Sequence, residues 1–209
     1  PYYYLKRALQ PLGMSISNEG TNGLFVHLIN EHAEAISVKL VVNVYKSGQT
    51  LISQEVPKVM LMPRDNQTYP LLKWFDRFMD FSNAYRFGPA LADCIHIQLL
   101  DSSNQILNDA FWLPLGFTPF QPETLGLQAT VEILENGDAL VTLLTKRLAI
   151  AVYFEIDGFI PEDAYFNLAP NSPKIISMRP NKQRSLNIFG YVSALNSTES
   201  ILITLANQH

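Results

Sequence analysis

The most distinctive side chains in this sequence are the aromatic residues of segment 74–87, WFDRFMDFSNAYRF. An aromatic face can stack on the apolar face of a sugar ring. We therefore take Trp74, Phe75, Phe78, Tyr85 and Arg86 as candidate carbohydrate-binding residues. The alternative is that these side chains pack in a core or against a neighbouring domain. We favour that alternative, because large aromatic side chains dominate both cores and interfaces.

Two Asn-Glu pairs, Asn18-Glu19 and Asn30-Glu31, suggest a second kind of chemistry. Many retaining glycosidases place such a pair at the end of a barrel strand, where the glutamate serves as acid and base. That mechanism needs a second carboxylate about 5–5.5 Å away, and a full α/β barrel takes about 250 residues. The 209-residue chain has neither this length nor the helices. We expect Glu31 to lie in a turn after a strand, and we predict no catalytic residue in this sequence.

Metal-ligating residues are few and poorly spaced. The four histidines are His27, His32, His96 and His209, and no two of them have the spacing of metal ligands on one helix. Cys94 is the single cysteine and lies in an apolar run, so we expect a small buried side chain rather than a nucleophile. We predict that the chain binds neither a metal nor a cofactor.

A group of acidic residues surrounds Gly158, and it consists of Glu155, Asp157, Glu162 and Asp163. A calcium loop needs regularly spaced oxygen ligands, and residues 159–161 interrupt this run. We therefore expect a solvated loop here. Motifs for a nucleophilic serine, a phosphate loop or a dinucleotide site are missing from the sequence.

The composition excludes several classes of protein. Hydrophobic residues make up 47% of the chain and the net charge is −4, which does not fit a disordered protein. Lys and Arg are scattered, so the basic stripe that nucleic-acid binding needs is absent from the sequence. No apolar run approaches the ~18 residues of a membrane span. We expect neither nucleic acid nor membrane as a partner.

Short strand patterns separated by turn residues run through the chain, which is typical of a β-sandwich. Segment 36–45 is rich in β-branched residues, and Asn-Gly at 136–137 is a strong hairpin signal. The only helix-like stretches are 1–10 and 73–79, so a parallel α/β fold is not expected. The predicted strands are 24–29, 36–45, 50–56, 94–100, 106–113, 127–134, 139–145, 148–156, 174–178, 186–194 and 200–205.

Prolines and glycines divide this pattern into two halves. Segment 114–126, PLGFTPFQPETLG, has the composition of a semi-stiff linker. We predict an all-β fold of two consecutive immunoglobulin-like antiparallel β-sandwich domains. Segment 1–10 begins inside a helix pattern that Pro11 ends, and a lone helix of this length is marginal in water. We expect the chain to be a piece of a longer one, in which this helix ended an earlier domain.

Three segments carry a resemblance to a known family. Segment 2–9, YYYLKRAL, looks like the final barrel helix of glycoside hydrolase family 2 enzymes of the β-mannosidase branch. Segment 83–89, NAYRFGP, resembles a motif of the domain that follows the barrel. Segment 163–170, DAYFNLAP, resembles the D-N-Y-F-D-L-x-P-G segment of the last domain, with Ala164 and Asn167 in place of Asn and Asp.

The resemblance implies an exo-acting, retaining bacterial hydrolase that removes terminal β-linked mannose. It implies that both catalytic glutamates precede Pro1, so no catalytic residue is carried onto this chain. The partner would be the upstream catalytic barrel of the same chain, which Tyr85 and Arg86 could face. The predicted ranges are 1–12 for a remnant of the final barrel helix, 13–116 for the first sandwich, 117–126 for the linker and 127–209 for the second sandwich.

Three functions remain open at this point. The favoured one is a non-catalytic C-terminal accessory part that braces the barrel. The second is a stand-alone carbohydrate-binding module with Trp74, Phe75 and Phe78 as a stacking platform. The third is an array of immunoglobulin-like adhesion domains. The cell compartment also stays open, because a single cysteine suits the cytoplasm and the periplasm of a bacterium equally.

Overall fold

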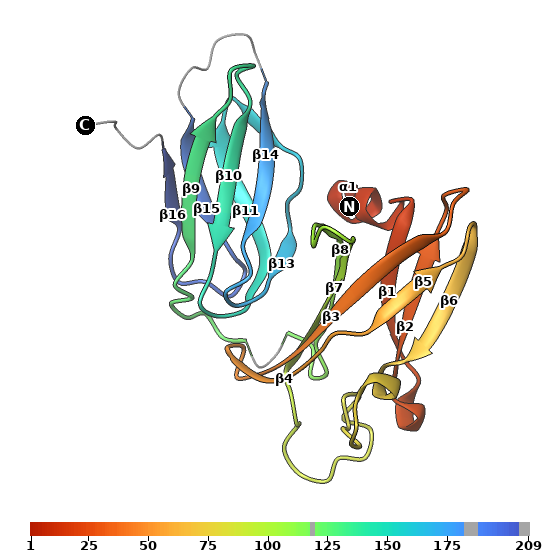
Figure 1. Ribbon diagram of the computed structural model, residues 1–209. Coiled ribbons are helices and arrows are strands. Elements are labelled where there is room, and N and C mark those ends of the chain that lie inside the picture. Colours follow the sequence, from red (N-terminus) through yellow and green to blue (C-terminus); the bar gives the residue numbers. More distant parts are fainter. Residues whose placement is uncertain (118–119, 182–187, 205–209) are drawn as a thin grey trace. The chain divides into compact units, whose positions relative to one another are not determined.

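The computed structural model describes residues 1–117, 120–181 and 188–204, and the chain divides into two compact units, 1–119 and 120–209. Each unit has a hydrophobic core of its own. Both are built from antiparallel sheets (Figure 1), so the predicted all-β fold of two sandwich domains is confirmed. None of the helices in the described ranges has the length and apolar character needed to span a lipid bilayer.

The first unit packs a three-stranded sheet on a larger one. The order of the smaller sheet is β1-β2-β6, and the order of the larger is β4-β3-β7-β8, with β5 also paired to β3. These strands are β1 (Leu12–Asn18), β2 (Leu24–Asn30), β3 (Ile36–Lys46), β4 (Thr50–Glu55), β5 (Lys58–Leu61), β6 (Asp65–Pro70), β7 (Cys94–Leu100) and β8 (Ile106–Trp112).

Alternating burial along the strands builds the core of the first unit. In β2, Leu24, Val26 and Leu28 are buried while the residues between them are partly exposed. The register of β3 on β7 pairs Val42 with Ile97, and both side chains are fully buried. Side chains on a strand point to opposite faces with a period of two, so one face of each sheet lies in this core.

Helical structure in the first unit is limited to short segments. The helix α1 (Tyr2–Ala8) forms where the sequence predicts one, and none of its residues is buried. Two 3₁₀ turns follow, η1 (Gly20–Asn22) and η2 (Leu71–Trp74). That α1 is a barrel remnant stays a prediction.

The predicted helix over 73–79 is wrong. The 3₁₀ turn η2 ends at Trp74, and Phe75 has an extended backbone with φ −107° and ψ 143°. Packing of Trp74 and Phe75 against the first core overrides the local preference for a helix here.

The second unit also has two sheets. Their orders are β12-β14-β10-β9 and β13-β11-β15-β16. Val141, Val152 and Met178 are among the fully buried side chains of the core between them. The strands are β9 (Gln128–Ile133), β10 (Ala139–Leu144), β11 (Ala149–Asp157), β12 (Phe159–Pro161), β13 (Phe166–Leu168), β14 (Lys174–Pro180), β15 (Phe189–Ser193) and β16 (Ile201–Thr204).

The solvated loop predicted around Gly158 is largely strand. Glu155 and Asp157 belong to β11, and β12 begins at Phe159. Gly158 has φ 76°, a left-handed conformation that glycine adopts without strain. It lets the chain pass from one sheet of the second unit to the other within a single residue.

Part of the segment with linker composition belongs to the second sandwich. Leu125 is 1% exposed, and its carbonyl accepts the backbone N–H of Lys146 at 3.1 Å. The Glu123 carboxylate contacts the Arg147 guanidinium at 2.9 Å. At the other end of this unit, the predicted strand ends Leu186 and Leu205, and also His209, lie outside the described residues.

Candidate functional site

The candidate aromatic residues lie at the end of η2 and on the connection from η2 to β7, and they divide into two sets. The inward set begins with Trp74 and Phe75, which are partly buried against the first core. The Trp74 ring lies 5.7 Å from that of Tyr69. The Phe75 ring lies 4.9 Å from that of Phe81, which is 2% exposed. Trp74 and Phe75 therefore pack toward the core and are less exposed than Phe78.

The outward set forms an exposed aromatic cluster, which we define as Phe78, Tyr85 and Phe87. These side chains are 64%, 39% and 91% exposed. The ring of Tyr85 lies 5.5 Å from Phe78 in an edge-on arrangement and 5.9 Å from Phe87 in a stacked one. Arg86, between two of these residues, is exposed and has φ 54°. This turn of the backbone brings the rings of Tyr85 and Phe87 to the same side.

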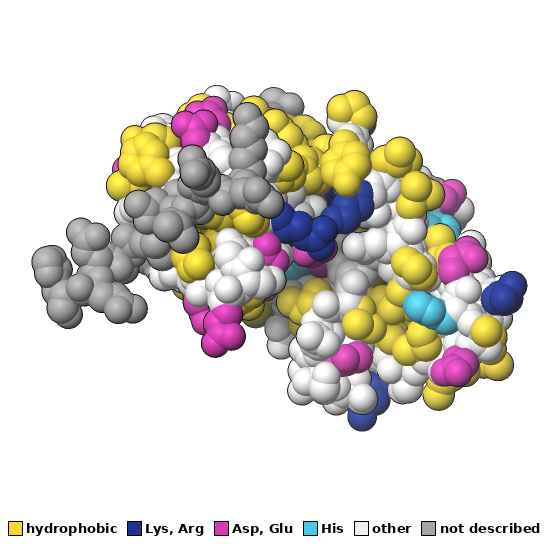
Figure 2. Space-filling model, turned by 90° about the horizontal axis from the view of Figure 1, so that it is seen from above, with side chains coloured by type: hydrophobic (Ala, Val, Ile, Leu, Met, Phe, Trp, Pro, Cys, Tyr) yellow, Lys and Arg dark blue, Asp and Glu magenta, His cyan; other side chains and the backbone are white. Residues whose placement is uncertain are grey.

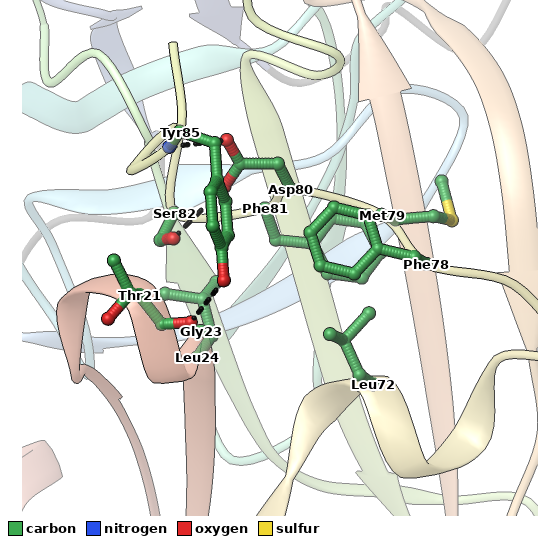
Figure 3. A pocket seen from close by; sticks show the side chains of 10 residues that line it. All are labelled: Thr21, Gly23, Leu24, Leu72, Phe78, Met79, Asp80, Phe81, Ser82 and Tyr85. Atoms are coloured by element: carbon green, nitrogen blue, oxygen red, sulfur yellow. Dashed lines mark hydrogen bonds between the residues drawn. The ribbon is translucent and has the colours of Figure 1, made fainter. Parts of the chain in front are cut away.

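A network of hydrogen bonds holds Tyr85 of the aromatic cluster in place, and Figure 3 draws part of it. The Asp80 carboxylate accepts bonds from the Ser82 hydroxyl at 3.1 Å, the Ala84 N–H at 3.1 Å and the Tyr85 N–H at 3.0 Å. The Tyr85 hydroxyl donates to the carbonyl of Thr21 at 3.0 Å. The irregular loop is thereby tied to η1, which precedes β2.

The hollow beside this cluster is small. Figure 3 shows Tyr85, Phe78 and Leu72 around it. Its interior leaves about 10 Å³ for the centre of a water molecule, and a buried water needs about 10–15 Å³ on this measure. The site offers a surface of rings rather than a pocket, so it can stack on a flat ligand or pack on a protein but cannot enclose a substrate.

The remaining residues that could do chemistry have structural roles. The side chain of Asn30 is 1% exposed and donates to the carbonyls of Glu34 at 2.9 Å and Met62 at 3.0 Å. Glu31 follows β2 and is exposed, as expected for a turn. Cys94 is fully buried, as predicted, and burial raises the pKa of its thiol well above the ordinary value, with Asp93 adding to the shift.

The histidines within strands are also placed without a metal site. His27 hydrogen-bonds the hydroxyls of Ser17 at 2.8 Å and Thr68 at 3.0 Å. His96 is 1% exposed, and its ring stacks on Phe111 at 4.3 Å. Across residues 1–117, 120–181 and 188–204, no group of three His, Cys, Asp or Glu side chains is arranged to hold a metal ion.

A second aromatic surface was not predicted from the sequence. On β15, Phe189 and Tyr191 are 55% and 43% exposed, and Leu202 on β16 lies opposite Tyr191. The signal for it was the alternation in residues 189–193, where the exposed rings flank the buried Gly190. On the face drawn in Figure 2, hydrophobic side chains reach the surface in several places.

No family model matches the sequence, and no curated protein matches it either. Solved structures share its fold. The β-D-mannosidase from Dictyoglomus thermophilum has a TM-score of 0.74 and 15% sequence identity, over 96% of this chain and 23% of that chain. The exo-chitosanase CsxA from Amycolatopsis orientalis has a TM-score of 0.66 and 14% identity, over 97% of this chain and 27% of that chain.

These comparisons confirm the resemblance inferred from the sequence as a likeness of fold to family 2 glycoside hydrolases. The chain spans about a quarter of the length of these two solved structures. The likeness extends over both units. The two solved structures therefore share the order of the two sandwiches along the chain as well as the fold of each.

Proposed function

We propose that this chain is the non-catalytic accessory part of a family 2 glycoside hydrolase that removes terminal β-linked mannose. Catalysis would belong to a barrel elsewhere in the parent chain. The observation that carries the proposal is the likeness to a β-D-mannosidase, which covers 96% of this chain and 23% of that enzyme. The three sequence segments that resemble the β-mannosidase branch support the same choice of substrate.

The chemistry of the candidate site supports an accessory role. Glycoside hydrolysis generally needs two carboxyl groups that face each other across the scissile bond. The hollow beside the aromatic cluster offers one, Asp80, whose oxygens already accept three hydrogen bonds from its own loop. A carboxylate that organises a loop in this way is poorly suited to transfer protons to a substrate.

In this proposal the exposed side chains brace the barrel. The aromatic cluster and the tyrosines of α1, of which Tyr2 is 69% and Tyr4 is 59% exposed, are apolar surfaces of the first unit. Exposed apolar surface of this kind usually marks a contact with another protein surface. Arg86 lies between Tyr85 and Phe87 along the chain and would supply a charged contact beside the cluster.

The test compares the complete gene product with the 209-residue chain. Both are assayed against p-nitrophenyl glycosides of β-mannose, β-glucosamine and β-glucuronic acid. We expect the complete protein to hydrolyse the β-mannoside and the 209-residue chain to hydrolyse none. Activity of the 209-residue chain would overturn the accessory role. If the complete protein prefers another sugar, only the proposed substrate specificity is overturned.

A second candidate function is carbohydrate binding by the chain itself, and the exposed aromatic cluster favours it. Sugar rings stack on exposed aromatic faces, and the cluster presents three adjacent aromatic rings. Isothermal titration with β-1,4-manno-oligosaccharides tests this function. If it is correct, Phe78→Ala and Phe87→Ala weaken binding, while Phe189→Ala, a similarly exposed ring of the second unit, does not. Flat titrations with every oligosaccharide would remove it.

A further inference from the structure

A second surface hollow lies on the first unit, away from the aromatic cluster. Side chains of β3, β5 and the β7–β8 hairpin turn line it, and they include Ser37, Lys39, Lys58, Asp101, Ser102 and Asn104. Its volume is about 280 Å³, near the lower end of the ~300–1,000 Å³ of small-molecule sites. A single sugar-sized molecule or a smaller ion fits this space.

Two lysines line this hollow because of the strand register. Lys39 of β3 pairs directly with Lys58 of β5, and like charges that face each other across an antiparallel pair are destabilising. The ammonium group of Lys39 donates to the side-chain oxygen of Asn104, which fixes it toward the hairpin turn. Both lysines line the hollow, and a bound anion would offset the repulsion between these facing positions.

The only acidic group among these lining residues is Asp101, and the turn occupies it. Its Oδ1 accepts bonds from the Ser103 N–H at 2.8 Å, the Ser103 hydroxyl at 2.7 Å and the Gln105 N–H at 2.9 Å. Hydrogen bonds lower the pKa of Asp101, and the bond from the Ser103 hydroxyl has a larger effect than the bond from the Gln105 N–H. The carboxylate is thus ionised at neutral pH, and two lysines against one carboxylate leave the hollow with one net positive charge.

We propose that this hollow binds a small oxyanion, the carboxylate or phosphate group of a sugar-sized molecule, between Lys39 and Lys58. The hydroxyls of Ser37 and Ser102 are further donors at its wall. Hydrogen bonds from ammonium groups to anionic oxygens are about twice as strong as neutral ones. This inference is independent of the proposed accessory role, because none of its groups belongs to the aromatic cluster or to α1.

The binding test is an NMR titration of the ¹⁵N-labelled 209-residue chain at constant ionic strength. The probes are inorganic phosphate, D-glucuronate and D-glucose. We expect saturable shifts of the amides of Lys39, Ser102 and Asn104 with phosphate, glucuronate or both, and none with neutral glucose. The anion that saturates identifies the group. Absent or linear, non-saturating shifts with both anions would overturn the proposal.

Substitutions separate binding from a structural role of the lysines. Lys39→Gln and Lys58→Gln should each weaken anion binding by about tenfold, since each removes a charge-assisted contact. Lys146→Gln, at an exposed lysine of the second unit, should leave it unchanged. Lysine on an edge strand can also deter pairing between molecules. The proposal is overturned if Lys58→Gln binds the anion as well as the native chain does and also forms new dimers on size exclusion. The lysines would then serve to prevent strand pairing between molecules.

Discussion

The two units present aromatic side chains to solvent by different means. In the first unit, Phe78, Tyr85 and Phe87 lie on an irregular loop that the Asp80 carboxylate organises. In the second unit, Phe189 and Tyr191 project directly from β15. One surface depends on a few side-chain hydrogen bonds and the other on the backbone pairing of a sheet.

This difference implies that the two surfaces can be disturbed in different ways. Loop positions held by local hydrogen bonds open at a small fraction of the global free energy of unfolding. The strand β15 is paired on both sides, with β11 and β16. Rings on such a central strand change position only when the sheet itself unfolds. The loop surface can therefore be altered while its sandwich stays folded, and the strand surface cannot.

The largest expected effect is that of Gly190→Ala, in the strand between the two exposed rings. A Cβ at this position would lie 2.3 Å from the carbonyl oxygen of Glu155 and 2.7 Å from the Cα of Ile156. Backbone atoms cannot move aside cheaply, so we expect the second unit to lose about 3 kcal/mol of stability. Both tryptophans, Trp74 and Trp112, belong to the first unit.

Tryptophan fluorescence therefore follows the first unit alone in urea, while far-UV circular dichroism follows both units. We expect the fluorescence midpoint of Gly190→Ala to stay unchanged while part of the dichroism transition moves to lower urea. The matched control is Gly13→Ala in β1, where the added Cβ would lie 3.4 Å from the Cβ of Ile29. Equal losses in the two variants would contradict the steric argument.

A second prediction concerns the alkaline limit of the first unit. Burial, with a smaller effect of Cys94, raises the pKa of Tyr45 from 10.0 to about 12. Between pH 10 and 12 the unfolded chain releases this proton while the folded unit retains it, so stability falls as the pH rises. The contribution is fully present below pH 10 and amounts to about 2–3 kcal/mol.

The measurement is the urea midpoint of tryptophan fluorescence from pH 9 to 12. We expect the midpoint to fall across this window in the native sequence. In Tyr45→Phe, which has no ionisable group at this position, the fall should be shallower. An identical pH profile for the two proteins would show that Tyr45 does not govern the alkaline limit.

The third prediction targets the loop. In Asp80→Asn, the carboxylate that accepts the N–H groups of Ala84 and Tyr85 becomes a neutral amide. Hydrogen bonds to a charged acceptor contribute about 1.5–3 kcal/mol, and their partial loss should speed hydrogen exchange of these two amides by about tenfold or more. Exchange in β2 and β7 should stay as in the native protein.

Asp76→Asn is the control, because Asp76 is an exposed carboxylate of the same loop. It should leave the exchange of Ala84 and Tyr85 unchanged. If Asp80→Asn instead lowers the global urea midpoint as much as Gly190→Ala does, the loop and strand surfaces do not differ in the way proposed.

Regular strands were the part of the fold most readily predicted from the sequence. The strand 94–100 occurs as Cys94–Leu100, because its apolar residues serve a buried strand in the middle of a sheet. The strands that were not predicted, β1, β5, β6, β12 and β13, all lie at sheet edges. In β6 the sequence DNQTYP is polar because half-exposed edge strands need few apolar residues, so its pattern resembles a loop.

The candidate site could be predicted only as a set of residue types. The aromatic run was evident, but whether each ring points inward or outward depends on the path of an irregular backbone. Hydrogen bonds to Asp80 and left-handed residues such as Arg86 set that path. Neither follows from a period of 2 or 3.6, which is why the sequence predicted a helix over 73–79 and did not separate Phe75 from Phe78.

The smallest predicted effect comes from removing a single hydroxyl from each of the two aromatic surfaces. Tyr85→Phe keeps the ring of the aromatic cluster and removes the hydroxyl that donates to the Thr21 carbonyl. The contact is exposed, so we expect a loss of only about 0.5–1 kcal/mol, with amide shift changes concentrated at Thr21 and Asn22. The matched variant is Tyr191→Phe, on the strand surface of the second unit. It should shift amides only near its own ring and leave both urea transitions in place, because backbone pairing rather than a hydroxyl bond holds that ring in position.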